Sequence, residues 1–261
     1  MADVQENLRY FTESHAWEQQ GDEWSEPWGG TEALWSGVIY PRIRRFLPVP
    51  SILEIAPGFG RWSHFLREYC RKITLVDLTP RCIEACRERF RTDPRVSCYV
   101  NDGRTLPMIP EHSVDFVFSF DSLVHVEAEV VQSYLQELAQ KLSPDGVAFL
   151  HHSNMGAYPV WTSLLRPLPL RVRGALMRRG ILDPDGWRSY SVSAEIFARL
   201  CDDAGLQCAG QELINWRAMR LTDCFSIVTR KVSRWAQPNQ VVRNAQFMQE
   251  AERVKAAAVR R

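Results

Sequence analysis

The sequence lacks a charge surplus of either sign, a long hydrophobic run and any cysteine pair with Cys-x-x-Cys spacing. Its 32 lysines and arginines balance 31 aspartates and glutamates, which argues against a general nucleic-acid binder because such proteins need a basic surplus. No apolar run reaches the length of a membrane-spanning helix, so an integral membrane protein is excluded. The first residues lack a basic start followed by an apolar core, so no export signal is expected. Seven scattered cysteines are typical of reduced thiols in a cytoplasmic protein.

What remains is the composition of a globular protein, with charge and aromatic residues unevenly distributed. Hydrophobic residues make up 45% and charged residues 24% of the 261 positions, enough for one large α/β domain or two small ones. Four of the nine tryptophans fall in the first 35 residues. Aromatic side chains at this density normally bury against something, so residues 1–46 are predicted to form a tryptophan-rich cap.

From about residue 50 the chain alternates between short apolar runs and segments with helical spacing. Strands are expected at 51–56, 72–78, 96–100, 114–120, 147–152, 207–216 and 224–230. Helices are expected at 62–70, 81–90, 127–142 and 194–204, with a turn at 143–146. Strands that are apolar on both faces and alternate with helices indicate a parallel sheet covered on both sides.

Two segments interrupt this alternation. Residues 153–190 are rich in proline, arginine and tryptophan, with five arginines between 166 and 179, and are interpreted as an insertion that forms a lid. Residues 230–261 carry eight basic groups, and residues 232–261 are predicted to form a basic, mostly helical tail. The central domain is therefore assigned to residues 47–231.

The first strand leads into a glycine-containing loop, ILEIAPGFGRW, at residues 52–62. Glycines let the backbone turn sharply at the carboxyl edge of the sheet and approach a ligand closely. Asp77 ends the second strand about 20 residues later, where a carboxylate can hold ribose hydroxyls. Asp102 follows the third strand. A nucleoside across this edge would meet all three features, although each aspartate could instead be a helix cap or turn residue.

A dinucleotide dehydrogenase is the competing interpretation of this loop. Its fingerprint requires a third glycine three positions after Gly60, where this sequence has Ser63. Pro57 also removes a backbone donor that a pyrophosphate could use. These details disfavour a diphosphate ligand.

The segments EIAPGFG, LVDLTP, NDG, VDFVFSFDSLVHV, LSPDGVAFLHH and CFSIVTR together resemble the class I S-adenosylmethionine-dependent methyltransferases. The resemblance is strong over residues 50–152 and weaker over 192–230. It implies a Rossmann-like α/β sheet, mostly parallel with an antiparallel last strand and helices on both faces. It also implies S-adenosylmethionine as cofactor and S-adenosylhomocysteine as product. The matching positions for cofactor binding are Glu54, Ala56, Gly58, Phe59, Gly60, Asp77, Leu78, Asp102, Gly103 and Phe120. Ala56 replaces the usual first glycine, and Pro57 is a further departure from the family pattern.

Methyl transfer to a hydroxyl requires a base, whereas transfer to a thiolate does not. The candidate bases follow the fourth and fifth strands and are Asp121, His125, His151 and His152. Successive strand residues point to opposite faces, so one of His151 and His152 is expected to reach the pocket. The alternative role for each histidine is packing or a core hydrogen bond. No ligand spacing such as His-Glu-x-x-His is present, so no metal is predicted.

The acceptor is predicted to be a small molecule, and glycosylated and anionic acceptors are both compatible with the sequence. Sugars pair their apolar faces with aromatic rings, so Trp24 and Trp28 are the predicted contacts, together with Asn154 after the fifth strand. The arginines of the insertion match a phosphate, although a membrane surface or a solvated lid would also explain them. A homodimer is left open, because the acidic first segment and the basic tail could meet between subunits.

The sequence thus favours O-methylation of a hydroxyl on a sugar or similar polar metabolite. N-methylation of a small amine is the alternative within the class. A catalytically inactive, methyltransferase-like binding protein is the alternative from another class, motivated by Ala56 and Pro57. Nucleic acid is not expected as a substrate, because no Asn-Pro-Pro-Tyr-type loop follows the fourth strand.

Overall fold

The computed structural model describes residues 4–15, 17, 19–160, 163, 168–169, 171–172, 175–176, 187–216 and 218–259. Half of the predicted lid, including four of the five arginines between 166 and 179, lies outside the described residues. Within the described part of the chain, no helix combines the length and the apolar character that crossing a membrane requires.

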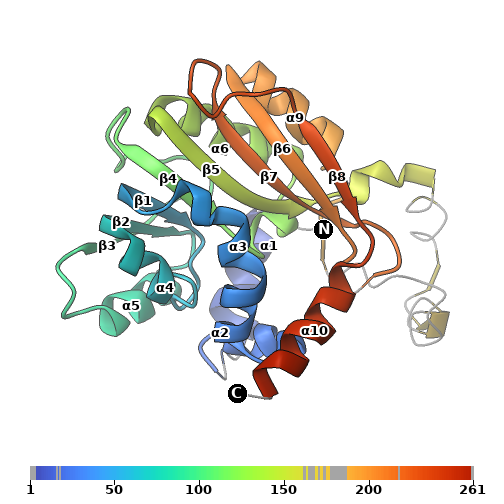
Figure 1. Ribbon diagram of the computed structural model, residues 1–261. Helices are drawn as coiled ribbons and strands as arrows, with labels where there is room; N and C mark the ends of the chain where they lie inside the picture. Colours follow the sequence, from blue (N-terminus) through green and yellow to red (C-terminus); the bar gives the residue numbers. More distant parts are fainter. Residues whose placement is uncertain are drawn as a thin grey trace.

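A single eight-stranded sheet forms the centre of the molecule (Figure 1). Its strands, in sheet order, are β3 (Val96–Val100), β2 (Cys70–Asp77), β1 (Val49–Ile55), β4 (Val114–Ser119), β5 (Leu142–Ser153), β7 (Asp223–Arg230), β6 (Leu206–Ile214) and β8 (Gln240–Asn244). Strand β7 runs antiparallel to both of its neighbours, and all other pairs are parallel. The predicted mostly parallel sheet with an antiparallel strand near 224–230 is confirmed.

Helices cover both faces of this sheet, because its strands alternate between two cores. In β1, Ile52 belongs to one buried cluster and Leu53 to the other. One face is covered by α6 (Ala128–Lys141) and α9 (Ala194–Asp203) (Figure 1). The other face is covered by α2 (Thr31–Leu34), η3 (Trp35–Ile39), α3 (Tyr40–Ile43), α4 (Ser63–Leu66), α5 (Pro80–Arg89) and α10 (Phe247–Val259).

The remaining elements are short helices in connections and in the N-terminal segment. They are α1 (Val4–Arg9), η1 (Tyr10–Ser14), η2 (Asp22–Trp28), η4 (Arg44–Phe46), η5 (Arg67–Tyr69), η6 (Leu123–His125) and η7 (Met155–Ala157).

The register of the parallel strands brings several loops to one edge. Ile55 of β1 pairs with Val76 of β2, and Ser119 of β4 pairs with Leu150 of β5. The residues that follow these strands therefore emerge side by side. This edge carries the candidate site.

Two local expectations from the sequence need correction. The turn expected at Ser143–Gly146 is an irregularity within β5, because Val114 pairs with Leu142 whereas Phe116 pairs with Val147. The tail expected to be mostly helical contains strand β8, which pairs in parallel with β6 before α10 begins. Helix α10 then packs against η2 and α2, so the C-terminal helix lies beside residues 22–34 (Figure 1).

Candidate functional site

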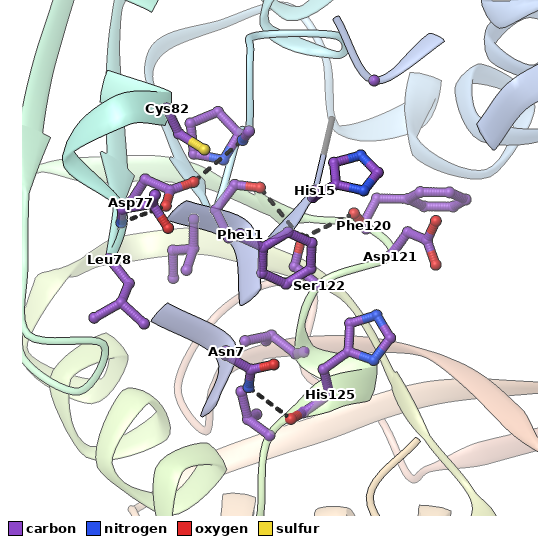
Figure 2. Close-up of a pocket in the computed structure, with 18 of the residues that line it drawn as sticks. Asn7, Phe11, His15, Asp77, Leu78, Cys82, Phe120, Asp121, Ser122 and His125 are labelled. Carbon is purple, nitrogen blue, oxygen red and sulfur yellow. Dashed lines mark hydrogen bonds between the residues drawn. The ribbon is translucent and has the colours of Figure 1, made fainter. Parts of the chain in front are cut away.

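A cavity of about 520 Å³ opens at the carboxyl edge of the sheet (Figure 2). Its floor comes from the loops after β1, β2 and β4, and its roof from the N-terminal segment and from Trp187 and Arg188. Cavities of this size are typical of small-molecule and cofactor sites.

The glycine loop after β1 has the backbone conformation that a close ligand approach requires. Gly58 has φ +57, and a Cβ there would lie 3.0 Å from the ring of Trp17. Ala56 also adopts a positive φ, of 57, so this alanine takes the left-handed conformation that glycine adopts without strain. Ala56, Gly58 and Phe59, which the sequence predicts to bind the cofactor, line the cavity.

Asp77 lies where the second strand meets this loop. One of its carboxylate oxygens accepts a 2.8 Å hydrogen bond from the N–H of Thr79, and the other accepts one of 3.2 Å from the N–H of Gly58. Burial raises the pKa of Asp77 to about 6, against the effect of these hydrogen bonds. Asp77 and Leu78 both line the cavity.

Glu54 and Gly60 do not line the cavity. Glu54 is buried beneath the loop and accepts a 2.5 Å hydrogen bond from Ser63 Oγ. Burial raises the pKa of Glu54 to about 8. Gly60, with φ +81, lets Phe90 approach, since a Cβ would lie 2.7 Å from that ring. Both residues therefore support the loop from behind, which corrects the prediction of direct cofactor contact.

The predicted cofactor contact of Asp102, the acid after the third strand, also needs a correction. The carboxylate of Asp102 accepts hydrogen bonds from the N–H groups of Arg104 and Thr105 and from the hydroxyl of Thr105. It does not line the cavity, whereas Gly103, with φ +76, does. Asp102 is thus a turn residue, which is the alternative role that the sequence left open for it. The backbone at Gly103 faces the cavity.

Two of the four predicted bases, Asp121 and His125, line the cavity together with Phe120. His125 Nδ1 lies 3.2 Å from the carbonyl oxygen of Trp187. A carbonyl can only accept, so Nδ1 carries the proton and Nε2 keeps its lone pair. Burial, helped by Arg188, lowers the pKa of His125, which keeps the ring neutral.

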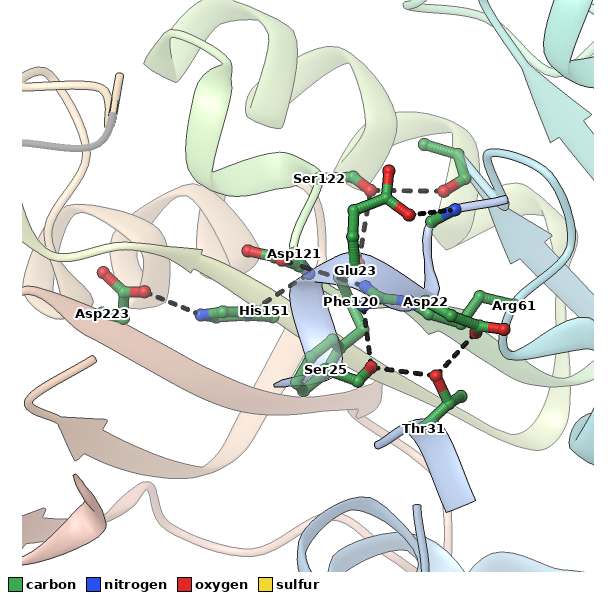
Figure 3. A network of polar contacts seen from close by, with 12 residues as sticks. Asp22, Glu23, Ser25, Thr31, Arg61, Phe120, Asp121, Ser122, His151 and Asp223 are labelled. Carbon is green, nitrogen blue, oxygen red and sulfur yellow. Dashed lines mark hydrogen bonds and ion pairs between the residues drawn. The ribbon is translucent and has the colours of Figure 1, made fainter. Parts of the chain in front are cut away.

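His151 and His152 do not line the cavity, which corrects their assignment as bases. The N–H of Asp121 donates to His151 Nδ1 at 3.1 Å, and His151 Nε2 donates to Asp223 at 3.1 Å (Figure 3). Both ring nitrogens of His151 are therefore occupied. His152 points to the opposite face of the sheet, where it stacks on Phe197 with ring centroids 3.9 Å apart. Burial lowers its pKa to about 3.

Asp223, behind His151, also accepts hydrogen bonds of 2.6 and 2.7 Å from Arg188. This chain of contacts links the cavity-lining Arg188 to the backbone of Asp121, whose φ is +61. Asp121 is thus held in an uncommon backbone conformation by a buried network.

Of the three predicted substrate residues, one lines the cavity and two do not. Trp24 lines the cavity. Trp28 is core, packed against Trp216 and Phe247. Asn154 is buried, accepts a hydrogen bond from the N–H of Ala194 and donates to the carbonyl of Leu221. The assignments of Trp28 and Asn154 as substrate contacts are therefore wrong, because packing and helix capping occupy these side chains.

Sequence reasoning did not select several residues that form the roof and inner wall. They are Val4, Asn7, Tyr10, Phe11, His15, Trp17, Arg61, Trp187, Arg188 and Trp216. Trp17 stacks on Phe59 at 4.3 Å, and Tyr10 contacts Trp187 at 4.2 Å. The sequence feature that could have identified Arg61 as a site residue was its position directly after Gly60. The others come from segments without a recognisable motif.

Among the described residues, no group of three or more histidine, cysteine, aspartate or glutamate side chains could hold a metal ion.

Comparison with known proteins shows what part of the chain is similar to. Residues 52–146 match the family described as "Methyltransferase domain". Nodulation protein S of Sinorhizobium fredii is 24% identical over 100 residues, which are 38% of this chain and 45% of that protein. The chain thus matches less than half the length of this curated relative.

Solved structures share the fold at low sequence identity. An S-adenosylmethionine-dependent methyltransferase from Mesorhizobium loti has a TM-score of 0.53 at 16% identity, covering 76% of this chain and 98% of that one. One from Clostridium acetobutylicum has a TM-score of 0.54 at 12% identity, covering 77% and 92%. The PH0226 protein from Pyrococcus horikoshii has a TM-score of 0.56 at 17% identity, covering 85% and 96%. The fold is that of the class I methyltransferases.

The domain match and these neighbours indicate S-adenosylmethionine as the cofactor. The cavity fits such a group because two glycines that line it, Gly58 and Gly103, have positive φ values, and this cradle places no side chain between the backbone and a ligand. Asp77, at the end of β2, supplies a carboxylate beside this cradle.

Proposed function

We propose that this protein is an S-adenosylmethionine-dependent methyltransferase that methylates a hydroxyl of a sugar or another polar small metabolite. The observation that carries the proposal is that the neutral imidazole of His125 lines the same cavity as the glycine loop and Asp77. A cofactor cradle and a proton acceptor share one enclosed space.

The cofactor supplies an activated methyl group, and the chain's own residues supply alignment and proton removal. Ala56, Gly58, Asp77, Leu78 and Gly103 would hold the cofactor. His125 Nε2 would take the proton of the acceptor hydroxyl, since Nδ1 is committed to the carbonyl of Trp187. His151 would act through its hydrogen bond to the N–H of Asp121, as a positioning residue.

The roof would exclude water from this space. Trp17 lies over Phe59, and Tyr10 meets Trp187, so aromatic rings from the N-terminal segment, the loop after β1 and the end of the insertion close over the cavity. Exclusion of water strengthens hydrogen bonds inside the site and limits side reactions.

An amine acceptor is the second candidate, favoured by one feature. The carboxylate of Asp121 lines the cavity together with the ring of Trp24, and carboxylates and aromatic faces both attract cations. An amine would need no base once it is deprotonated, so loss of His125 would affect its methylation little.

The first test is calorimetric titration with S-adenosylhomocysteine. We expect micromolar binding to the wild-type protein, a loss of at least tenfold in Asp77→Asn, and no binding of NAD. Failure of the wild-type protein to bind S-adenosylhomocysteine would contradict the cofactor assignment.

The second test follows radiolabelled methyl transfer to a panel of sugars, alcohols and amines. We expect transfer to hydroxyls that His125→Gln abolishes while S-adenosylhomocysteine binding is retained. His64→Gln, which changes a histidine outside the cavity, is the matched control. Transfer to an amine that survives in His125→Gln would select the amine alternative, and binding without any transfer would favour the inactive binding protein.

A further inference from the structure

We propose that Arg61 and Asp121 form a neutral pair that selects an uncharged, hydroxyl-rich ring as acceptor and bridges one of its hydroxyls. This inference deepens the proposed function and depends on it. Arg61 follows the glycine loop, and both side chains line the inner part of the cavity. No motif assigns a role to Arg61.

Arg61 is an unusual arginine because it is almost fully buried, with 6% of its surface exposed. Among the described residues, its guanidinium makes one hydrogen bond, of 3.2 Å from Nη1 to Ser25 Oγ. A guanidinium has five N–H donors, and buried donors normally find partners. Its remaining donors are therefore available to a molecule in the cavity.

Asp121 faces Arg61 across a gap. Its Oδ2 lies 3.8 Å from Arg61 Nη2, which is too long for a hydrogen bond. A hydroxyl beside this gap can accept from the guanidinium and donate to the carboxylate at the same time. Neither an ammonium nor a carboxylate can do both, because the first only donates and the second only accepts.

The charges around the pair favour the same class of acceptor. Burial lowers the pKa of Arg61, while the carboxylates of Asp121, Asp22, Glu23 and Glu54 oppose this effect. Asp22 accepts from Thr31, and Glu23 accepts from the N–H of Gly21 (Figure 3). Glu54 accepts from Ser63 Oγ and does not line the cavity. Those three acids therefore have protein partners, and Asp121 is the carboxylate that remains beside Arg61. A charged acceptor would leave one member of this buried pair uncompensated, which is costly.

Aromatic faces complete the subsite. The guanidinium of Arg61 lies 4.3 Å from the ring centroid of Trp62 and 5.4 Å from that of Trp24. Trp24 is held in place by stacking on His15 at 4.8 Å. Flat rings beside a donor–acceptor pair suit a sugar ring, which combines apolar C–H faces with hydroxyls at its rim.

The test measures binding to protein saturated with S-adenosylhomocysteine, so that it does not depend on turnover. The probes are the methyl glycosides of hexoses, 2-amino-hexoses and hexuronates in the gluco, galacto and manno configurations. Within each configuration the amino sugar carries an ammonium in place of the 2-hydroxyl, and the uronate carries a carboxylate in place of the 6-hydroxymethyl group. Tryptophan fluorescence and ligand-observed NMR report affinity.

We expect the wild-type protein to bind at least one neutral hexoside tenfold or more tightly than its charged counterparts. Arg61→Met leaves Asp121 unbalanced and should shift the preference to the amino sugar. Asp121→Asn should shift it to the uronate. Arg91→Met, which removes an exposed arginine outside the site, is the matched control and should keep the wild-type order.

The two variants should still bind S-adenosylhomocysteine within about threefold of the wild type, which verifies their folding. Equal or tighter wild-type binding of a charged ring would overturn the inference, as would an order of preference that neither variant changes. Binding of S-adenosylhomocysteine without binding of any glycoside would also overturn it. If S-adenosylhomocysteine itself does not bind, the proposed function fails instead.

Discussion

One hydrogen bond decides which nitrogen of His125 can accept a proton. The carbonyl of Trp187 holds the proton on Nδ1 and leaves Nε2 as the basic atom. Trp187 lies near the end of the insertion at 153–190, so a segment remote in sequence sets the tautomer of the proposed base. This is the same arrangement by which a backbone carbonyl commonly orients a functional histidine.

The lowered pKa of His125 predicts the acidic limb of the activity profile. A base acts only when it is unprotonated, so activity should persist below the ordinary histidine pKa of about 6.5 and fall at lower pH. The measurement is kcat against pH with a hydroxyl acceptor and saturating S-adenosylmethionine. A limb with its midpoint above the ordinary value would contradict the assignment of His125.

Glu54 should make stability depend on pH in the opposite sense to most acids. Its pKa is about 8 in the folded protein but near 4.5 in the unfolded chain, so the unfolded state loses the proton first. The free energy of unfolding should therefore fall as pH rises from about 4.5 to 8, by on the order of 4 kcal/mol. Glu54→Gln removes this titration and keeps an acceptor for Ser63.

Urea denaturation at pH 5 and pH 8.5 tests this expectation. Glu54→Gln should unfold at similar urea concentrations to the wild type at pH 5 and at higher concentrations at pH 8.5. An equal loss of stability with pH in both proteins would show that another group titrates.

At the scale of elements, the conformation of the loop after β1 depends on Gly58. Gly58 has φ +57 and lies under the ring of Trp17, so it combines a left-handed backbone with a close contact. Gly58→Ala should lower the free energy of unfolding by about 1–3 kcal/mol and weaken S-adenosylhomocysteine binding at least tenfold, as measured by calorimetry.

Gly205 provides the matched control for this substitution. It has φ +77 at the end of α9, and an added Cβ would meet nothing within 4 Å. Gly205→Ala should cost about 1 kcal/mol of stability and leave cofactor binding unchanged. Equal effects of both substitutions on binding would mean that Gly58 matters only through backbone strain.

Some strands could be predicted from the sequence and others could not, for physical reasons. The strands β1, β2 and β4 were visible as apolar runs because burial on both faces requires hydrophobic residues at every position. Strand β8 was not, because it lies at the sheet edge and its residues are largely exposed. An edge strand of mixed composition carries no periodic signal.

At the scale of the whole molecule, helix α10 near the C-terminus packs against the N-terminal segment next to the site. Phe247 of α10 is fully buried and contacts Trp28 of the N-terminal segment at 5.0 Å and Trp216 at 5.7 Å. Since Trp216 also lines the cavity, the tail supports one wall of the site through this aromatic cluster.

Removing Phe247 should therefore destabilise the protein. Phe247→Ala is expected to lower the free energy of unfolding by about 3–5 kcal/mol, measured by urea denaturation. Val259→Ala, at an exposed position of the same helix, should change it by less than about 0.5 kcal/mol. A small effect of Phe247→Ala would mean that α10 contributes little to folding.

The local order of residues was enough to predict the sheet without its edge strand β8, the glycine loop, and the position of Asp77 at the end of β2. These features depend on periodicity and on the spacing between consecutive strand ends. It was also enough to place Asp121 and His125 near the fourth strand. It could not distinguish them from His151 and His152, since the direction of each side chain depends on the partners it finds: Asp223 for His151, and Phe197 for His152. Arg61 gained its neighbours Ser25 and Asp121 from distant segments. Contacts between such segments form only when the chain packs, and no spacing in the sequence encodes them.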